Sequence, residues 1–252
     1  MKVLVSNVQR LCFQDGPGLR TTVFSMGCPI KCLWCCNPEN LTHSVKTCGN
    51  KTWGKYYETD ELIELLLRDR NYYGEDGGIT FSGGEFLTHI DEFEEVLLKL
   101  KTEHINLCVE TSLYCTQDNL GKALQYFDEF IIDFKILTTV EAEAMCAADP
   151  NVFMRNFRYF AESCDTEYTV RIPCMKYSAE ENNLDIICSM ISDRRPSQVE
   201  VFKIHNLGIS KYNDLGLEYK YDESLSVSDE TMDKVKEHFS DKGLMCNIIK
   251  IN

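Results

Sequence analysis

Three closely spaced cysteines, Cys28, Cys32 and Cys35, are the residues of this sequence best suited to chemistry. Gly27 and Pro29 stand beside the first of them, as expected of a loop that must wrap around a bound group. A structural zinc site needs four ligands, and the common ferredoxin run has two-residue gaps and a fourth cysteine before a proline. Neither matches. Three thiolates on a four-iron cluster leave one iron without a protein ligand, and an open metal position is typical of a site that binds a substrate. The alternative is a zinc-binding or redox-silent cysteine loop.

The other cysteines do not complete this group in an obvious way. Cys36 directly follows Cys35, which places it poorly for the same tetrahedron, and Cys48 is a more distant candidate. The chain has 13 cysteines, and an odd count without a secretory signal favours thiols or metal ligands over disulfides. We expect most of the others to be small buried apolar residues.

The overall composition is that of a globular protein with a full core. Of the 252 residues, 44% are hydrophobic and 26% are charged. The net charge of −14 argues against nucleic acid and against anionic lipid as partners. No run approaches the roughly 18 apolar residues of a membrane span, and the first apolar run is short for a signal peptide. We therefore expect a cytoplasmic protein.

Short apolar runs rich in β-branched residues alternate with helical patterns along the chain. The expected strands are Thr22–Met26, Gly78–Ser82, Asn106–Glu110, Phe130–Asp133, Tyr168–Ile172 and Val199–Ile204. The expected helices are Glu61–Arg68, Asp91–Glu103, Thr116–Phe127, Thr139–Ala147, Val152–Ser163, Glu180–Ser192 and Asp229–Phe239, followed by a short apolar run, Met245–Ile249. Strands separated by helices imply right-handed βαβ units and a parallel sheet.

Six such units predict an α/β fold, a partial (β/α)6 TIM-type barrel that is open, with Lys2–Val8 as an added edge strand. We expect residues 1–252 to form one domain, with the cluster loop at 27–40 and a C-terminal helix and strand within 228–250. Parallel barrels carry their chemistry at the C-terminal ends of the strands. The groups that follow or end the six expected strands are the cysteines, Gly83-Gly84-Glu85, Glu110-Thr111, Asp133 with Lys135, Arg171 and His205. The sequence therefore predicts that they share one rim.

Several stretches of this chain resemble a known family. The matching segments are QDGPGLRTTVFSMGCPIKCLWC, NPE, ITFSGGE, IIDFK, VRIP and HNLGISKYNDLGLEY, within residues 9–222. The cysteine loop resembles the radical S-adenosylmethionine superfamily, and the first and last segments resemble its activating enzymes of glycyl radical enzymes, such as that of pyruvate formate-lyase. The resemblance implies one [4Fe–4S] cluster on Cys28, Cys32 and Cys35, with S-adenosylmethionine on the open iron. It further implies cleavage to a 5′-deoxyadenosyl radical, which removes a Cα hydrogen from a glycine of a partner enzyme. Flavodoxin or ferredoxin is the expected reductant.

The resemblance assigns the methionine end of the cofactor to charged and glycine residues on the rim. Gly83, Gly84 and Glu85 match the motif that contacts its amino group; the bland alternative is a strand-ending turn. Lys135 would neutralise its carboxylate. Arg171 is a plausible second partner for that carboxylate, because its rigid fork suits such groups, and is otherwise a structural ion pair.

The resemblance also implies a monovalent-cation and cofactor site. Asp133, Thr111 and an acidic residue at position 110 match it. Position 110 is Glu110 where aspartate is usual. The extra methylene displaces that carboxylate, so the sequence leaves open whether a cation binds. Asp133 and Lys135 would otherwise form a solvated pair.

Three further positions take their roles from the resemblance. Asp15, which begins the Asp-Gly-Pro-Gly turn, would contact the backbone around the target glycine, or is an ordinary loop residue. His205 would lie beside adenine, or is a satisfied core histidine. Trp34 would cover the cluster or adenine, or is a packing anchor.

Besides Glu110, the chain departs from the family pattern at two further positions. Cys36 stands where histidine is usual, and Phe86, which follows the glycine motif, stands where proline or a small residue is usual and could reshape the wall near the cluster. Residues 37–77 contain one cysteine, Cys48, which favours the short type with a single cluster. Two other functions stay open: a radical enzyme acting on a small molecule or peptide, and a non-catalytic iron–sulfur electron carrier or zinc-binding module.

Overall fold

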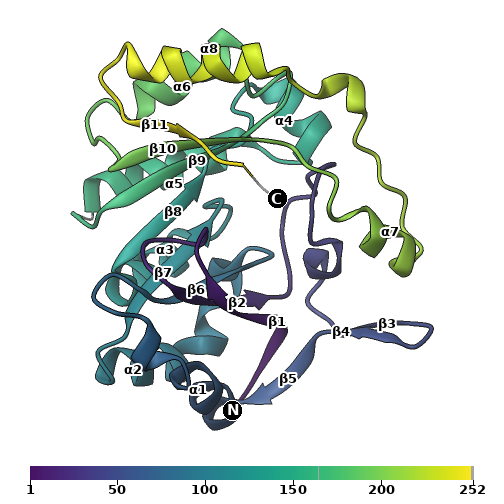
Figure 1. Cartoon of the computed structure of the whole chain (residues 1–252), viewed down its shortest axis with the longest axis vertical. Helices are drawn as coiled ribbons and strands as arrows, with labels where there is room; N and C mark the ends of the chain where they lie inside the picture. Colours follow the sequence, from purple (N-terminus) through teal and green to yellow (C-terminus); the bar gives the residue numbers. More distant parts are fainter. Residues whose placement is uncertain (164, 251–252) are drawn as a thin grey trace.

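The computed structural model describes residues 1–163 and 165–250 and is built around a nine-stranded sheet (Figure 1). In spatial order its strands are β11 (Cys246–Ile248), β10 (Gln198–Lys203), β9 (Tyr168–Cys174), β8 (Glu129–Asp133), β7 (Asn106–Thr111), β6 (Gly78–Gly83), β2 (Arg20–Ser25), β1 (Lys2–Cys12) and β5 (Lys55–Glu58). In this spatial order, all neighbouring strands from β11 to β2 pair in parallel, whereas β1 runs antiparallel to both β2 and β5. A separate hairpin pairs β3 (Lys46–Cys48) with β4 (Lys51–Trp53).

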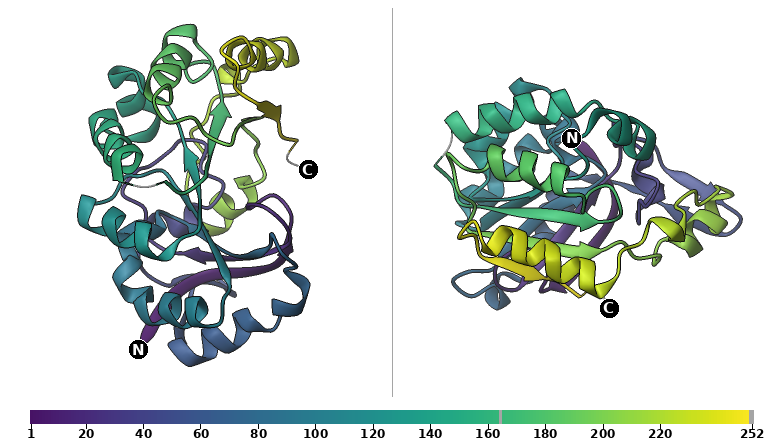
Figure 2. Two further views of the ribbon diagram at one scale, coloured as in Figure 1. Left: turned by 90° about the vertical axis from the view of Figure 1, so that its left-hand side faces the viewer. Right: turned by 90° about the horizontal axis from the view of Figure 1, so that it is seen from above.

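Helices connect the parallel strands, and most of them cover the outer face of the sheet (Figures 1 and 2). They are α1 (Thr59–Leu67), α2 (Glu94–Thr102), α3 (Gln117–Tyr126), α4 (Thr139–Cys146), α5 (Pro150–Ser163), α6 (Glu181–Met190), α7 (Ile209–Leu215) and α8 (Asp229–Ser240). The 3-10 helices are η1 (Pro38–Leu41), η2 (Arg70–Tyr72), η3 (Phe86–Phe93) and η4 (Glu223–Leu225). Ser228 caps α8 by accepting a hydrogen bond from the Thr231 amide, and that helix packs on β10 and β11. Within the described residues, no helix is both long enough and apolar enough to cross a membrane.

The alternation of residues along the parallel strands explains how one sheet carries both a core and a polar interior. Successive side chains point to opposite faces of a strand. The residues that pack against the helices include Leu107, Val109, Phe130, Ile132, Val170, Ile172, Val199 and Val201. The residues between them face the inside of the curved sheet, and the register places Arg171 between Asp133 and Glu200 on neighbouring strands. Polar side chains therefore meet on the concave face.

The predicted α/β fold is confirmed, including the six parallel strands β2 and β6 to β10 and the added parallel strand in the Met245–Ile249 run. Because β5 and β11 form its two edges, the sheet is an open barrel. On the open side, Gln14 Nε2 donates to the Lys250 carbonyl oxygen at 3.3 Å.

Two sequence predictions about elements are wrong in detail. The segment Lys2–Val8 is not an edge strand, because β1 continues to Cys12 and β5 pairs along its outer side. The expected helix Asp91–Glu103 becomes α-helical only at Glu94, since the chain enters it through the 3-10 helix η3. Neither β5 nor the hairpin has an apolar run, so the pattern used to find strands passed over them.

Candidate active site

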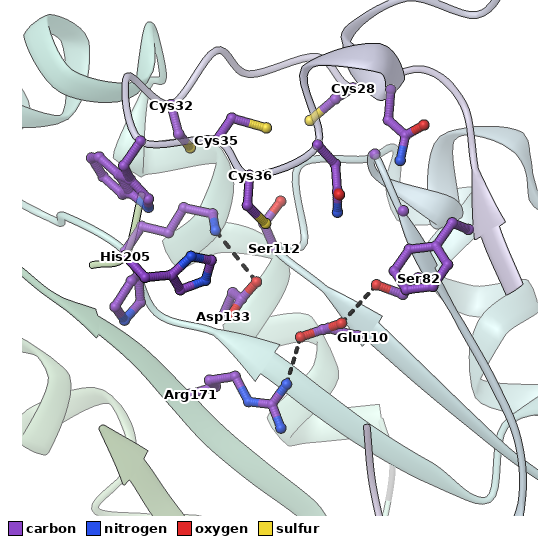
Figure 3. A pocket seen from close by; sticks show the side chains of 18 of the residues that line it. Cys28, Cys32, Cys35, Cys36, Ser82, Glu110, Ser112, Asp133, Arg171 and His205 are labelled. Carbon is purple, nitrogen blue, oxygen red and sulfur yellow. Dashed lines mark hydrogen bonds and ion pairs between the residues drawn. The ribbon is translucent and has the colours of Figure 1, made fainter. Parts of the chain in front are cut away.

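A cavity of about 490 Å³ lies at the C-terminal ends of the parallel strands, beneath the cysteine loop (Figure 3). This volume is typical of sites for small molecules and cofactors. The sequence-predicted residues that line it are Asp15, Cys28, Cys32, Trp34, Cys35, Gly83, Gly84, Glu110, Thr111, Asp133, Lys135, Arg171 and His205. Glu85 is the one predicted residue outside this lining. The shared rim expected from the strand ends is thus present in the structure.

The cysteine loop follows β2 and is fastened to two other parts of the chain. The Gly27 amide donates to the Asn40 carbonyl oxygen at 2.8 Å. The amide of Lys31 donates to the Cys146 carbonyl oxygen at 2.7 Å, and the amide of Leu33 donates to the Met145 carbonyl oxygen at 2.9 Å. These last two bonds flank Cys32 and tie it to the C-terminal end of α4.

The surroundings of the three thiols differ. Burial, with a smaller contribution from the charge of Glu85, raises the pKa of Cys28 to about 12, and burial also raises the pKa of Cys35. A hydrogen bond with the Cys146 thiol, helped by the charge of Lys135, lowers the pKa of Cys32 despite its burial. Metal ligation requires thiolates, so binding at this loop must release protons from Cys28 and Cys35.

The amide of Asn40 provides a test of whether the cavity suits a polar ligand. Asn40 is 1% exposed and lines the cavity, and among the described residues neither its Oδ1 nor its Nδ2 has a hydrogen-bond partner. A buried polar group without a partner costs about 1–3 kcal/mol. A cluster and a nucleoside cofactor beside three thiols would supply such partners, so the residues present fit these groups.

Glu85 lies behind the cavity wall, where the protein uses both of its carboxylate oxygens. Oε1 accepts from the Thr111 hydroxyl at 2.7 Å, and Oε2 accepts from the amide and hydroxyl of Ser112 at 2.8 and 2.6 Å. The side chain is fully buried, and burial raises its pKa against the effect of these bonds. The direct contact with an ammonium group that the sequence suggested is therefore not part of this geometry. Instead, Glu85 fixes the turn after β7.

The two glycines before Glu85 are required by the cysteine loop. Gly83 has φ of +117°, and a Cβ added to Gly84 would lie 2.1 Å from the Gly27 carbonyl oxygen. The Gly84 amide donates to the Ser25 carbonyl oxygen at 3.0 Å, and the Glu85 amide donates to the Gly27 carbonyl oxygen at 2.8 Å. The turn therefore carries the base of the loop, while both glycines also line the cavity.

A network of charges forms the floor of the cavity, opposite the loop (Figure 3). Arg171 Nη1 donates to Glu110 Oε1 at 2.6 Å, and Nη2 donates to Glu200 Oε2 at 2.8 Å. Lys135 Nζ lies 3.3 Å from Asp133 Oδ2. Although burial opposes it, the charge of Arg171 lowers the pKa of Glu110, whereas burial raises the pKa of Asp133.

This network shows how the cations of the rim are used. Burial alone would lower the pKa of Lys135, but Asp133 and the neighbouring thiols raise it well above its usual value. For Arg171, Glu110 and Glu200 likewise outweigh burial and raise the pKa. Both cations are therefore permanently charged beside carboxylates, and they face a cavity that can accept a zwitterionic ligand.

Asp15 is held at the cavity wall by hydroxyl groups of two strands. The Thr22 hydroxyl donates to Asp15 Oδ2 at 2.6 Å, and the Thr80 hydroxyl donates to the Asp15 carbonyl oxygen at 2.6 Å. Arg20 Nε in turn donates to the Thr80 hydroxyl at 2.7 Å. Burial, together with the charge of Glu110, raises the pKa of Asp15.

The aromatic residues of the rim stand beside the cysteine loop. His205 is half-buried, and burial lowers the pKa of its imidazole, which favours the neutral ring. Trp34 is 8% exposed and belongs to a small apolar cluster with Ile30, Met175 and Tyr221. Trp34 therefore both packs and lines the cavity.

Comparison with known proteins agrees with this arrangement. The family model described as the Radical SAM superfamily matches residues 22–187, the span from β2 to α6 that carries the cysteine loop. The chain belongs to the radical SAM superfamily. Membership implies a [4Fe–4S] cluster and S-adenosylmethionine as its cofactors.

Curated relatives of this radical SAM protein match along most of its length. A 4-hydroxyphenylacetate decarboxylase activating enzyme from Clostridium scatologenes is 27% identical, over 98% of this chain and 97% of the relative. A choline trimethylamine-lyase activating enzyme from Oleidesulfovibrio alaskensis is 25% identical, over 93% and 94%. The first alignment has 303 positions against 252 residues here, so that relative contains segments that this chain lacks.

Solved structures show the same fold at low sequence identity. A domain of pyruvate-formate lyase-activating enzyme from Bacteroides vulgatus superposes with a TM-score of 0.57 and 22% identity, over 69% of this chain and 99% of that one. Streptococcus suis SuiB, bound to a precursor peptide, superposes with a TM-score of 0.63 and 13% identity, over 92% and 48%.

Two residues by which this radical SAM protein departs from the family pattern, together with Cys48, lie in three different environments. Cys36 lines the cavity, whereas Cys48 is exposed in β3 and outside the lining. Phe86 does not shape the wall, because it is fully buried against Phe81 and Phe93 in the main core. Sequence reasoning missed Cys146 and Asn40, since one ends a helix and the other follows the cysteine motif, without a spacing that marks them.

Proposed function

We propose that this radical SAM protein is the activating enzyme of a glycyl radical enzyme. The observation that carries the proposal is the near full-length match, over 93–98% of this chain, to curated proteins named as activating enzymes of different partners. The cavity rim, with Asp15 on its wall, is the second support. We further propose that residues 1–252 act as one domain and work in the cytoplasm, where thiols stay reduced.

When bound, the reduced cluster and S-adenosylmethionine supply one-electron cleavage to methionine and a 5′-deoxyadenosyl radical, which takes a hydrogen atom from glycine Cα and leaves 5′-deoxyadenosine and a glycyl radical. Cys28, Cys32 and Cys35 would hold the cluster. Lys135 and Arg171 would pair with the carboxylate of the methionine part, and the carbonyl groups of Gly83 and Gly84 would face its ammonium group.

The other rim residues orient and enclose the reactants. Asp15, held by Thr22 and Thr80, would accept from the backbone amide beside the target glycine. His205 and Trp34 would cover the nucleoside and keep water from the reacting carbon. Glu85 would act through Thr111 and Ser112 as a positioning residue.

The electron donor and the cation are finer parts of the same proposal. A small reductant protein, a flavodoxin or a ferredoxin, would supply the electron. Glu110, Thr111 and Asp133 would be the protein ligands of a monovalent cation, but Glu110 already pairs with Arg171 at 2.6 Å. Equal rates of cleavage in potassium and tetramethylammonium buffers would show that the guanidinium serves in place of the cation.

The decisive experiment is anaerobic incubation of the reconstituted protein with S-adenosylmethionine, a reductant and a candidate partner. We expect 5′-deoxyadenosine by chromatography and a glycine-centred doublet by electron paramagnetic resonance. The Cys32→Ala variant should lose both, and Cys48→Ala, outside the cavity, should keep both.

Three outcomes separate the alternatives. Nucleoside formation with a peptide or small molecule, and none of the doublet with any glycyl radical enzyme, would favour another radical SAM reaction. Absence of nucleoside from a protein with a reducible cluster would favour an electron carrier, and zinc in place of iron would favour a zinc module.

A further inference from the structure

A second group of metal-ligating side chains lies away from the cavity. His43, His89 and Glu92 offer ligand atoms that all lie within 4.8 Å of one another. The three residues are outside the cavity lining. His43 is in the loop after η1, and the other two are in η3, so the group joins two separate segments of the chain.

The local structure of η3 explains why His89 and Glu92 share one face. A 3-10 helix has three residues per turn, so side chains at positions i and i+3 stand directly above one another. His89 Nδ1 lies 3.1 Å from Glu92 Oε1 as a result. An α-helix beginning at Asp91, as the sequence suggested, would not have included His89.

His43 completes the group from the opposite side. Its Nε2 lies 3.3 Å from Glu92 Oε2, so the carboxylate presents one oxygen to each imidazole. The two rings stack with centroids 3.9 Å apart. Two ligands of a tetrahedral ion with bonds of about 2.0–2.1 Å are separated by about 3.3 Å. Each nitrogen thus lies close to that separation from one oxygen of Glu92, and a single carboxylate oxygen would be the ligand.

The same two histidines lie against the start of the cysteine loop. A Cβ added to Gly27 would lie 2.2 Å from His89 Nε2 and 3.2 Å from the Cβ of His43. Gly27 directly precedes Cys28. The His43 side chain is 34% exposed, so an ion can reach the group from solvent.

From this geometry we infer that His43, His89 and Glu92 bind a divalent first-row transition-metal ion, preferably Zn²⁺, separate from the iron–sulfur site. Two imidazoles and a carboxylate are a common ligand set for zinc, with a water in the fourth position. The bound ion would link the loop after η1 to η3 and fix the two imidazoles that pack against Gly27. The inference does not depend on the proposed function.

The test uses the anaerobically reconstituted holoprotein, in which the cysteine loop is occupied. The protein is equilibrated with chelator-buffered Zn²⁺ and desalted, and zinc and iron are measured on the same sample by plasma mass spectrometry. We expect about one zinc per chain in the wild type and at least about tenfold less in H43A and H89A, with iron unchanged. The matched control is H238A, because His238 forms a single imidazole–carboxylate pair with Asp185 at 3.2 Å. It should keep its zinc.

Zinc K-edge absorption identifies the ligands of the retained ion. Nitrogen and oxygen at about 2.0–2.1 Å support the site, whereas a sulfur shell at about 2.3 Å places the ion on cysteines and overturns it. Equal zinc in H89A and the wild type, or none retained by the wild type, would also overturn the inference; Glu92 would then only hydrogen-bond both rings. Zn²⁺ should raise the melting temperature of the wild type and of H238A, but not of H89A.

Discussion

Arg20 and Arg171 are both buried in the same sheet, yet their partners differ in kind. Arg20 begins β2, is 0% exposed, and donates six hydrogen bonds to uncharged oxygens of Pro17, Asp76, Ile79, Thr80 and Asn106. Arg171, level with the C-terminal residue of β8, donates mainly to the carboxylates of Glu110, which lines the cavity, and Glu200. Arg20 therefore holds backbone segments together, whereas Arg171 places a positive charge at the cavity.

The largest effect should come from Arg20→Met. The change leaves buried carbonyl groups without donors and releases the turn that carries Asp15, so we expect a loss of at least about 3 kcal/mol in unfolding free energy. Urea unfolding of the reconstituted protein, followed by circular dichroism, measures it. An unchanged urea midpoint would mean that water replaces the guanidinium, and Arg20 would then not differ from Arg171 as a structural residue.

Arg171→Met should act on binding more than on folding. Glu110, which lines the cavity, and its neighbour Glu200 can take up a proton or water, so the fold should persist. Affinity for S-adenosylmethionine should fall about 100-fold, or about 2.7 kcal/mol. Isothermal titration on the cluster-loaded protein tests this. Arg171→Lys should recover part of the loss. If Arg171→Met instead unfolded the protein as readily as Arg20→Met, both arginines would be structural.

Asp69 is a buried carboxylate outside the cavity lining, and it pairs with the half-exposed side chain of Arg10. Its Oδ2 accepts from Arg10 at 2.6 Å and from the Thr21 hydroxyl at 3.0 Å. The hydrogen bond from Arg10 lowers the pKa of Asp69, so its stabilising contribution is present above about pH 4 and is lost as the pH falls further. Asp69→Asn should therefore cost about 2 kcal/mol at pH 7 and progressively less below pH 4. Urea unfolding across this range measures both, and a cost independent of pH would show that the ion pair contributes nothing.

The smallest effect should come from His205→Gln, which removes a ring but no charge. Burial lowers the pKa of His205, so the imidazole is neutral at pH 7 and becomes charged only below its usual value of 6.5. We expect affinity for S-adenosylmethionine to fall about threefold, or about 0.7 kcal/mol, and to stay constant between pH 7 and 8. A loss as large as that of Arg171→Met would show that the ring does more than cover the nucleoside.

The sequence predicted the parallel strands because short apolar runs alternate with helical patterns, and it predicted the shared rim because polar groups follow or end those runs. It could not predict that the Glu85 carboxylate turns inward, since that depends on Ser112 and Thr111 lying within reach after folding. Nor could it find Cys146, because only the packing of α4 against the loop brings that thiol to Cys32. The short strand β5 was not predicted for the same reason, because its pairing with β1 rather than its own residue pattern makes it a strand.

The contact between Gln14 and Lys250 on the open side of the sheet has a practical consequence. Ile249 lines the cavity, so a fluorophore attached at Lys250 would stand next to it. Met1 is instead 4.0 Å from Glu95 of α2, on the helix-covered side. Labels for following ligand binding therefore belong near the amino end, away from the cavity lining.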